Sequence, residues 1–344
     1  MKNMIRRSFI VLTGLIILAA SAGLAMAMHN GASKLPIKQY FSKSYTNAVW
    51  DWSNPVSKSN KELTDTASFL YLHQINQVYV DVSAYSATDK SNTNKKALDS
   101  ALSRYVTAMK KRNISVSAAA GDVNWSKLEN RSIPKQILKS VQNYNQAHPN
   151  AKLKGMEFDI ESYNQDSFAD SSPTEKGLVL TDFLDTVDQL KKANLAYIKT
   201  TSAQLELGFA VPYWFDNENG NIPVVTWHNK TGPTLYHLLD TLNELPQSNI
   251  VVMSYRNAAN GNDGVIFHSR TEIDYAAAKA QRVKVIIGQE VGQVDPAKIT
   301  YYGKSATEFA SQVSLVEQSF APTKVYGGIA INDLASFRLL DKNE

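Results

Sequence analysis

The stretch GMEFDIE, residues 155–161, decides the fold and places the candidate chemistry. Apolar and acidic residues alternate along it, and successive side chains of a β-strand point to opposite faces. Glu157, Asp159 and Glu161 therefore share one face, while the apolar residues between them share the other. If helices cover the apolar face, the three carboxylates point into the interior of a barrel.

Outward from this stretch, short runs rich in β-branched residues alternate with stretches of helical period. We expect strands at residues 48–52, 77–82, 114–119, 153–160, 205–211, 250–255, 283–288 and 325–332. We expect helices near residues 61–74, 93–112, 133–148, 175–194, 233–245, 271–282, 304–320 and 334–340. This alternation requires a parallel sheet, and eight units favour a closed barrel over an open doubly wound sheet. The predicted fold class is α/β, a single-domain (β/α)8 TIM barrel.

The N-terminus is typical of an export signal. Basic residues precede an apolar run over 9–20 and the small-x-small site Ala25-Met26-Ala27. We expect a signal peptide at 1–27, a polar leader at 28–45 and the barrel at 46–344, in a secreted or periplasmic protein. The alternative is an uncleaved membrane anchor, because the apolar stretch can be extended far enough to span a bilayer.

Charge and cysteine content exclude several classes of function. The formal charge is +4, but residues 1–27 hold three basic and no acidic residues, so the rest of the chain carries +1. This balance gives no indication of nucleic-acid binding. The absence of cysteine excludes a disulfide framework and thiolate metal ligands. No H-E-x-x-H, G-x-S-x-G, G-x-G-x-x-G or Walker motif is present, and no cofactor is expected.

Three acids on one buried strand face indicate function, because each ion loses hydration and repels the next. Glu161, at the C-terminal end, is the expected general acid. Asp159 lies one pleat deeper and would orient or polarise a group that Glu161 does not reach. Other strand ends add Tyr255 and Glu290 as catalytic candidates, since barrel enzymes carry their sites there.

Candidates for substrate binding share this end of the barrel, and the tryptophans among them could stack on sugar rings. They are Trp50, Trp52, Asp81, Glu157, Trp214, Arg256 and Asn332. The connection from Pro212 to Gly232 is expected to be a long structureless loop that forms a lid or a cleft wall.

The motif at 155–161 resembles the D-G-x-D-x-D-x-E strand of glycoside hydrolase family 18, the chitinase-like barrels. Gly155, Asp159 and Glu161 match it, while Lys154 and Glu157 stand where its first two acids should be. The resemblance implies substrate-assisted hydrolysis, a known exception to the two-carboxylate rule. Glu161 would protonate the leaving oxygen and Asp159 would hold the 2-acetamido group of the substrate.

Other segments resemble the same family. FAVP (209–212), MSY (253–255) and IIG (286–288) are similar to its fifth, sixth and seventh strands, and Tyr255 would steady the cyclised intermediate. Two departures put chitin-like specificity in question. Arg256 occupies the place of the usual Asp or Asn, and the eighth strand has no tryptophan.

From about residue 150 onward the chain is also similar to an uncharacterised group of bacterial glycoside-hydrolase-like barrel proteins. The shared motifs are DIESY (159–163), PYW (212–214), SYRN (254–257), GQE (288–290) and GIAI (328–331). Ser254 stands where that group has aspartate. This likeness implies a rival scheme in which Glu161 is the acid/base and Glu290 the nucleophile, with carboxyl groups roughly 5–5.5 Å apart.

The sequence thus predicts an exported glycoside hydrolase-like barrel that acts on a carbohydrate, N-acetylated in the substrate-assisted scheme. Two alternatives stay open. One is a non-catalytic carbohydrate-binding barrel. The other is a metal-dependent hydrolase with an all-oxygen site made of Asp81, Glu157, Asp159, Glu161 and Glu290. The expected partner is a carbohydrate, a membrane is contacted only through an uncleaved N-terminal segment, and no interface-like motif indicates an oligomer.

Overall fold

The computed structural model describes residues 41–42, 44–86, 92–165, 168–217, 220 and 222–342. They belong to one compact unit, residues 38–344. The predicted signal peptide and most of the predicted leader lie outside the described residues, so their boundaries stay predictions. Among the residues that are described, no helix has the length and apolarity needed to cross a bilayer.

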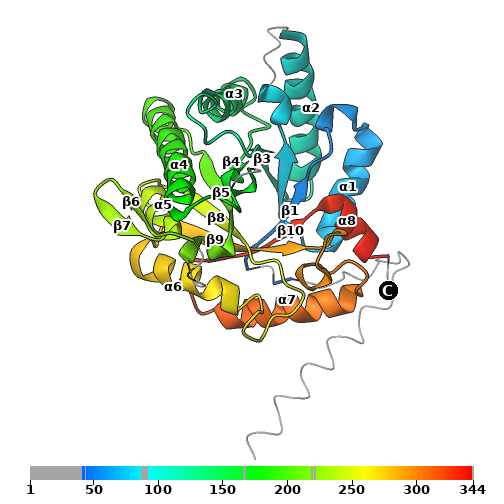
Figure 1. The fold of residues 1–344 in the computed structure, drawn as a ribbon. Coiled ribbons are helices and arrows are strands. Elements are labelled where there is room, and N and C mark those ends of the chain that lie inside the picture. Colours follow the sequence, from blue (N-terminus) through cyan, green and yellow to red (C-terminus); the bar gives the residue numbers. More distant parts are fainter. Residues whose placement is uncertain are drawn as a thin grey trace, which may run out of the picture. The chain divides into compact units, whose positions relative to one another are not determined.

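Eight parallel strands close into a barrel in the order β1-β10-β9-β8-β5-β4-β3-β2, inside a ring of helices (Figure 1). The strands are β1 Thr46–Asp51, β2 Gln77–Asp81, β3 Ser115–Gly121, β4 Gly155–Asp159, β5 Glu206–Pro212, β8 Ser248–Met253, β9 Val283–Glu290 and β10 Tyr326–Asn332. Each overlaps a strand expected from the sequence. The predicted (β/α)8 fold class is therefore confirmed.

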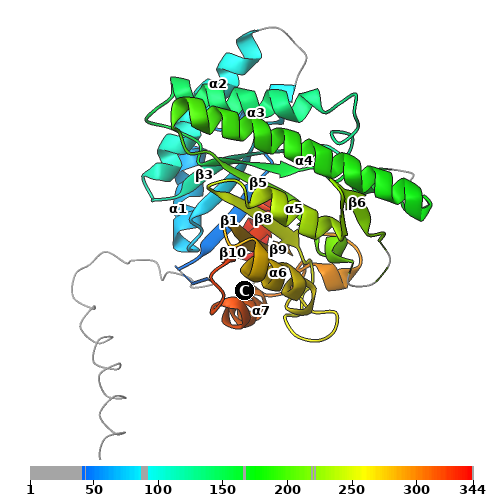
Figure 2. The same cartoon turned by 90° about the vertical axis from the view of Figure 1, so that its left-hand side faces the viewer.

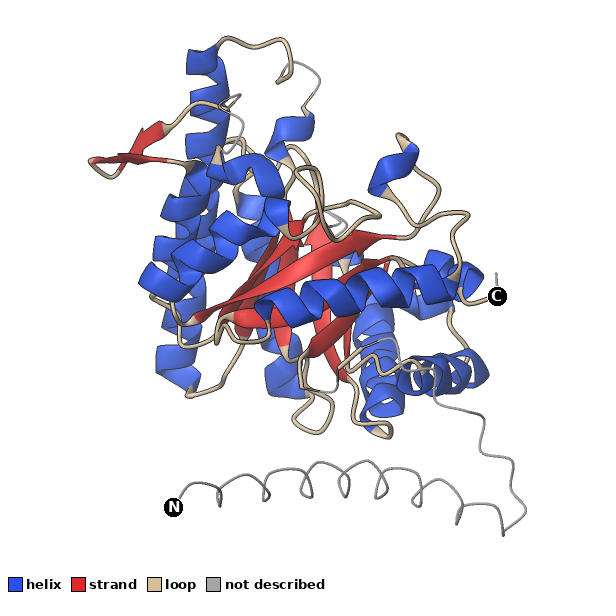
Figure 3. Cartoon of the chain, turned by 90° about the horizontal axis from the view of Figure 1, so that it is seen from below, coloured by secondary structure: helices blue, strands red, loops and turns tan. Residues whose placement is uncertain are grey.

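Within the described residues, eight α-helices alternate with these strands and cover the outside of the barrel, which Figure 3 shows from below. They are α1 Asn60–Leu72, α2 Asn92–Lys110, α3 Ser132–Ala147, α4 Pro173–Thr201, α5 Thr234–Leu242, α6 Arg270–Lys279, α7 Ala306–Phe320 and α8 Leu334–Leu340. Capping boxes fix the starts of two helices: Ser59 with Glu62 begins α1, and Ser172 with Glu175 begins α4.

Strand residues separate into two apolar sets. The outward set packs with the helices in one large core, and the smaller set fills the barrel interior. The interior set consists of Ala48, Trp50, Tyr79, Ala119, Ala210, Val251, Ile286 and Ala330. Because most of these side chains are small, the barrel has room for a few large or charged ones.

The seam between β1 and β10 depends on a glycine. Gly328 has φ of +126°, and a Cβ there would overlap the carbonyl of Thr46, its partner across the seam. Glycine tolerates both the left-handed φ and the close approach of the two backbones. The barrel therefore closes at a position where a side chain would separate the strands.

The connection after β5 is more ordered than the sequence predicted. It begins with the 3-10 turn η4, Tyr213–Asp216, and later forms an antiparallel hairpin of β6, Val225–Trp227, and β7, Lys230–Gly232. Trp227 Nε1 donates a hydrogen bond to Asp185 Oδ1 of α4 at 2.8 Å, and Figure 2 shows β6 beside that helix. The prediction of a structureless loop is wrong, because paired backbone and packing against α4 order residues 225–232.

Candidate functional site

Strand β4 presents its acids to the barrel interior, as predicted. The alternate residues Met156 and Phe158 are buried in the outer core with the helices. Glu157, with 1% of its surface exposed, points the other way, and Asp159 and Glu161 follow on the same side at half-buried positions. The period-2 alternation of the sequence thus carries the acids from the barrel core to its C-terminal mouth.

Glu161 lies just beyond β4 and is held by two donors. Tyr163 OH donates to Glu161 Oε1 at 2.7 Å, and Asn164 Nδ2 donates to Oε2 at 2.9 Å. Both donors come from the 3-10 turn Ser162–Asn164, so the turn aims them back at the carboxylate. Trp214 packs edge-on against Tyr163 with ring centroids 4.8 Å apart. Trp214, predicted to bind substrate, thus supports the ring that orients Glu161.

Asp159 has a carboxyl group with a raised pKa. Burial, and then the negative charge of Glu161, raise the pKa of Asp159 from 3.8 to about 7. Its Oδ1 is buried and has no hydrogen-bond partner among the described residues. Gly121 of β3 allows the close packing, since a Cβ there would overlap the Asp159 backbone. Asp159 therefore holds an acceptor for which the described chain supplies no donor.

A cavity of about 280 Å³ opens in front of these two acids. The described residues that line it come from the ends of β1 to β4: Trp52, Ser83, Gly121, Asp122, Val123, Asp159 and Glu161. Three predicted site residues, Trp52, Asp159 and Glu161, therefore share one cavity. Asp81 borders it indirectly, because its Oδ1 accepts the backbone N–H of Ser83 at 2.8 Å.

Tyr255 follows β8, and its phenol is close enough to the acids of the site for their charges to affect its pKa. Burial raises the pKa of its phenol well above 10, and the charges of Glu290, Asp159 and Glu161 raise it further. The phenol is therefore neutral over the physiological range and can donate a hydrogen bond. This is the property that the predicted role of Tyr255 requires.

Glu290, at the end of β9, is fixed by a chain of hydrogen bonds. Its Oε1 accepts the backbone N–H of Gly292 at 2.6 Å, and its Oε2 accepts Asn332 Nδ2 at 2.7 Å. Asn332 Oδ1 in turn accepts Trp52 Nε1 at 3.0 Å. Burial raises the pKa of Glu290, and these donors oppose that rise. Glu290 and Asn332 thus hold the Trp52 ring at the cavity wall.

The two tryptophans of β1 have different positions. Their rings are stacked with an interplanar angle of 8° and centroids 6.4 Å apart. Trp52 lines the cavity, whereas Trp50 lies in the barrel core against Tyr79, with 2% of its surface exposed. Contact of Trp50 with a ligand stays a prediction, and its observed neighbours make it the support on which Trp52 rests.

Glu157 lies deepest among the acids. Burial raises its pKa well above 4.5, and the charges of Glu206 and Asp159 raise it further. Gly208 of β5 gives its carboxyl group room, since a Cβ at that position would overlap Glu157 Oε2. Its Oε1 has no hydrogen-bond partner among the described residues. A role of Glu157 in substrate binding stays a prediction.

Solved structures of glycosidases share this architecture. A family 18 chitinase from Pseudoalteromonas aurantia aligns with a TM-score of 0.53 at 14% identity, over 86% of this chain and 96% of that one. A family 18 chitinase from Cycas revoluta, in complex with (GlcNAc)3, gives 0.51 at 12% identity, over 85% and 95%. An exo-β-1,4-mannosidase from an Opitutaceae bacterium gives 0.52 at 9% identity, over 83% of this chain and 51% of that one. The chain has the fold of the glycosidase barrels.

The resemblance to family 18-like barrels is thereby confirmed at the level of the fold. No protein-family model matches the chain, and a comparison with curated proteins gives no match. At 9–14% identity the likeness does not carry a substrate or a mechanism from one glycosidase barrel to another. Function therefore depends on the site residues of this chain.

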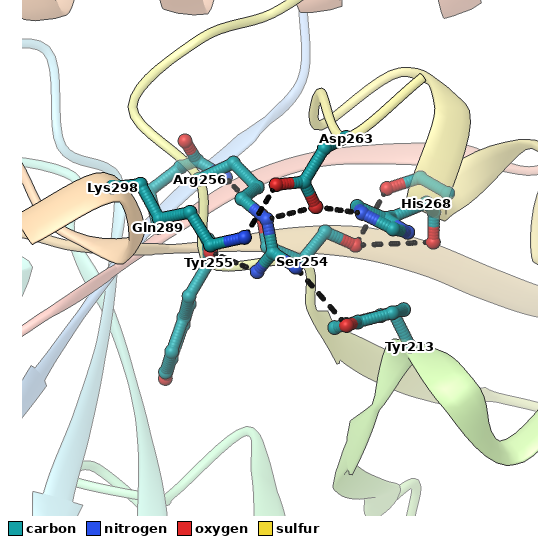
Figure 4. Close-up of polar contacts among 9 residues, drawn as sticks. Tyr213, Ser254, Tyr255, Arg256, Asp263, His268, Gln289 and Lys298 are labelled. Atoms are coloured by element: carbon teal, nitrogen blue, oxygen red, sulfur yellow. Dashed lines mark hydrogen bonds and ion pairs between the residues drawn. The ribbon is translucent and has the colours of Figure 1, made fainter. Parts of the chain in front are cut away.

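Arg256, a substrate-binding candidate, is engaged in an ion-pair cluster that Figure 4 shows. Its Nε lies 2.7 Å from Asp263 Oδ1 and its Nη2 donates to Tyr213 OH at 3.1 Å. His268 Nε2 and Lys298 Nζ bind the same Asp263 carboxylate, at 2.9 and 2.7 Å. Hydrogen bonds from Lys298, His268 and Arg256 lower the pKa of Asp263. We call Tyr213, Arg256, Asp263, His268 and Lys298 the Asp263 cluster.

The Asp263 cluster joins the loops that follow β5, β8 and β9, because Tyr213, Arg256 and Lys298 belong to these loops in turn. Arg256 Nη1 also donates to the backbone carbonyl of Tyr255 at 2.8 Å, while the Tyr255 phenol points away from the cluster (Figure 4). The cluster thus fixes the backbone from which Tyr255 extends. Sequence analysis missed Asp263 and His268, since no local motif marks them.

The all-oxygen metal site has no observed ligand set. Among the described residues, no group of three or more His, Cys, Asp or Glu side chains is placed to hold a metal ion. Sequence analysis also missed Ser83 and Asp122, which line the cavity. Asp122 had an available signal, because it directly follows strand β3, where barrel sites carry polar residues.

Proposed function

We propose that this chain is an exported glycoside hydrolase that cleaves a carbohydrate with Glu161 as its general acid. The observation that carries the proposal is the cavity at the C-terminal mouth, where Asp159 and Glu161 face the same space beside the Trp52 ring. The glycosidase fold supports it, and the Cycas revoluta chitinase that shares this fold was solved with an N-acetylglucosamine oligomer. Trp52 would stack on a sugar ring and direct the glycosidic oxygen to Glu161.

In the reaction that we favour, the substrate supplies its own nucleophile. Glu161 donates a proton to the glycosidic oxygen as the bond from that oxygen to the anomeric carbon breaks. The carbonyl oxygen of the 2-acetamido group bonds to the anomeric carbon, while Asp159 accepts the acetamido N–H and the Tyr255 phenol donates to the intermediate. Water then attacks the anomeric carbon and gives a proton to Glu161, while the bond from the acetamido oxygen to that carbon breaks and restores the acetamido group, so the configuration is retained.

The unpartnered Oδ1 of Asp159 favours this scheme over double displacement by Glu290. A free acceptor inside the cavity suits a group that binds the substrate amide. Asp159 belongs to the described cavity lining, whereas Glu290 does not. Glu290 instead positions Trp52 through Asn332. Substrate assistance requires Asp159→Asn to abolish turnover and Glu290→Gln to retain most of it, whereas double displacement requires the converse. Azide restoring turnover to Glu290→Ala would overturn the substrate-assisted scheme.

The deciding experiment is a hydrolysis screen over oligosaccharides of amino and neutral sugars, with wild type and Glu161→Gln side by side. Loss of the general acid should lower kcat by about 100- to 10,000-fold. Glu129→Gln is the matched control, because Glu129 is exposed outside the cavity. Unchanged turnover in Glu161→Gln would refute the role of Glu161. Binding without turnover in either protein would favour the non-catalytic carbohydrate-binding barrel.

A further inference from the structure

A second cavity, of about 360 Å³, lies outside the barrel between the β6–β7 hairpin and helices α4 and α5. We call it the hairpin cavity, because Trp227, His228 and Lys230 of the hairpin belong to its lining. Figure 1 shows β6 and β7 at the outer edge of the helix ring, beside α4 and α5. The described lining shares no residue with the cavity that holds Asp159 and Glu161. A ligand bound here would therefore not compete with a substrate at Glu161.

Trp227 is the largest aromatic residue of the hairpin cavity, and its ring is held in a fixed orientation. Its Nε1 donates to Asp185 Oδ1 of α4 at 2.8 Å, and Arg131 Nη1 donates to the other oxygen of Asp185 at 3.3 Å. The ring is half-buried, so part of it remains accessible at the cavity surface. Because its only donor is already bonded, a ligand meets the apolar face of the indole. Such a ring can stack on a flat ligand.

The turn of the hairpin places a second ring beside Trp227. His228 stacks on it with ring centroids 3.8 Å apart and an interplanar angle of 16°. His228 and Asn229 have φ of +46° and +62°, the left-handed values for which two-residue hairpin turns usually use asparagine and glycine. Histidine at the first of these positions reduces the turn propensity but adds an exposed ring to the cavity. This choice of residue favours a binding role for the turn.

The charged groups of the hairpin cavity are paired with one another. Lys191, with 5% of its surface exposed, has its Nζ 3.0 Å from Asp188 Oδ1 and 2.8 Å from Glu244 Oε2. Lys230 Nζ lies 3.6 Å from Asp240 Oδ2. Both lysines of the described lining thus have partners among its three carboxylates. An ionic ligand would have to compete with these pairs, whereas the hydroxyl groups of a neutral ligand can add hydrogen bonds to them.

Helix α5 adds neutral polar groups to the same lining. His237 is buried, and its Nε2 bonds to the carbonyl oxygen of Val225 at 3.2 Å. In the neutral ring this contact leaves Nδ1 as an acceptor. Thr241 Oγ1 donates to the His237 carbonyl oxygen at 2.7 Å and can still accept a hydrogen bond. The hairpin cavity therefore combines an aromatic surface with hydrogen-bonding groups of both kinds.

We infer that the hairpin cavity is a second, non-catalytic binding site for a neutral sugar unit of a glycan. A pyranose ring has flat faces of C–H groups and a rim of hydroxyl groups. Its face would stack on Trp227 or His228, while its hydroxyl groups bond to the paired charges around them. An acidic glycan gains less, because the lysines already have carboxylate partners. The site goes beyond the proposed function, and it would keep a polymeric substrate on the protein between cleavage events.

The test maps where ligands slow the hydrogen exchange of backbone amides, measured by mass spectrometry. The probes are β-1,4-linked hexasaccharides of glucose, mannose, xylose and N-acetylglucosamine, with a hexasaccharide of galacturonic acid as the acidic counterpart. They are added to Glu161→Gln protein, so that a substrate stays intact. At least one neutral hexasaccharide should slow exchange over residues 225–244. The effect should persist when Trp52→Ala is added, since Trp52 lines the other cavity.

Two substitutions separate loss of the ligand from loss of the fold. Trp227→Ala should weaken binding about 10-fold or more, although it also removes packing within the hairpin. His228→Asn removes the exposed ring but keeps a residue that favours the turn. It should therefore weaken binding about 2- to 10-fold without lowering the melting temperature. Tyr71→Ala, at an exposed aromatic residue of α1, is the matched control and should bind as the parent does.

Three results would overturn the inference: no neutral hexasaccharide slows exchange over residues 225–244, only the acidic one does, or the effect survives both Trp227→Ala and His228→Asn. None of them bears on the proposed hydrolase, which is judged by turnover. Conversely, slowed exchange over 225–244 in a protein whose wild type cleaves none of the hexasaccharides would support this site and count against the hydrolase. The two failures are thus distinguishable.

Discussion

Replacing Asp159 by asparagine should change how the stability of the protein depends on pH. The folded-state pKa of about 7 lies above the ordinary value of 3.8. The unfolded chain therefore ionises first, and stability is lost as the pH rises from about 4 through about 7. Complete ionisation of the folded carboxyl group should cost ~4 kcal/mol. Between about pH 5 and about pH 8 this single group should remove ~2.5 kcal/mol of unfolding free energy.

The asparagine side chain has no proton to lose in this pH range, so the Asp159→Asn protein should escape this loss. Urea unfolding at both pH values, for wild type and variant, gives a double difference in which the titration of distant groups cancels. The exposed Asp274→Asn is the control and should follow wild type. Parallel pH dependence of wild type and Asp159→Asn would refute the reasoning, since it would mean that burial and Glu161 do not perturb this carboxyl group.

Three further outcomes are expected. Asp263→Ala leaves the nearly buried Arg256 without its carboxylate and should lower the unfolding free energy by ~1–2 kcal/mol. Limited proteolysis should then cut residues 254–270 faster, and an unchanged cleavage rate would argue against the stabilising role of the Asp263 cluster. Gly208→Ala should destabilise by ~1–3 kcal/mol in thermal unfolding through overlap with Glu157, and the double variant with Glu157→Ala should recover part of that loss if overlap is the cause. N-terminal sequencing of the exported protein should begin directly after Ala27, whereas an intact Met1 would indicate an uncleaved anchor.

The barrel could be predicted because its information is local and repeated. Alternation over 155–161 fixed the inward face of β4, and eight β/α units gave the closed sheet. Helix α4 continues to Thr201, beyond the expected 194, because residues 195–201 contain no glycine or proline and the helix ends only where Ser202 takes φ of +54°. The β6–β7 hairpin was missed, because His228 and Asn229 occupy its left-handed turn positions and His-Asn is not a common hairpin dipeptide.

The site was predicted in part, for the same reason. Strand ends marked Asp159 and Glu161, which do share a cavity with Trp52. The sequence could not show that Asn332 links Glu290 to Trp52, since the contact of Asn332 with Trp52 joins residues 280 positions apart. It also could not show that Asp263 engages Arg256, because three loops have to meet before that carboxylate finds its partners. The local sequence pattern predicts which residues lie at the barrel mouth, whereas tertiary contacts determine what each of these residues does there.

The Asp263 cluster divides the loops of the barrel mouth into two groups, which should differ in how readily they accept amino-acid substitutions. The loops after β5, β8 and β9 are connected through the Asp263 carboxylate and its partner Arg256. A substitution in one of these loops should therefore disturb the other two. Ser83 and Asp122 lie outside this network, on the loops after β2 and β3. If the proposed function holds, substitutions in these two loops should change the sugar preference without disturbing the backbone that carries Tyr255. A library confined to positions 83 and 122–124 should yield many folded proteins with altered glycan choice.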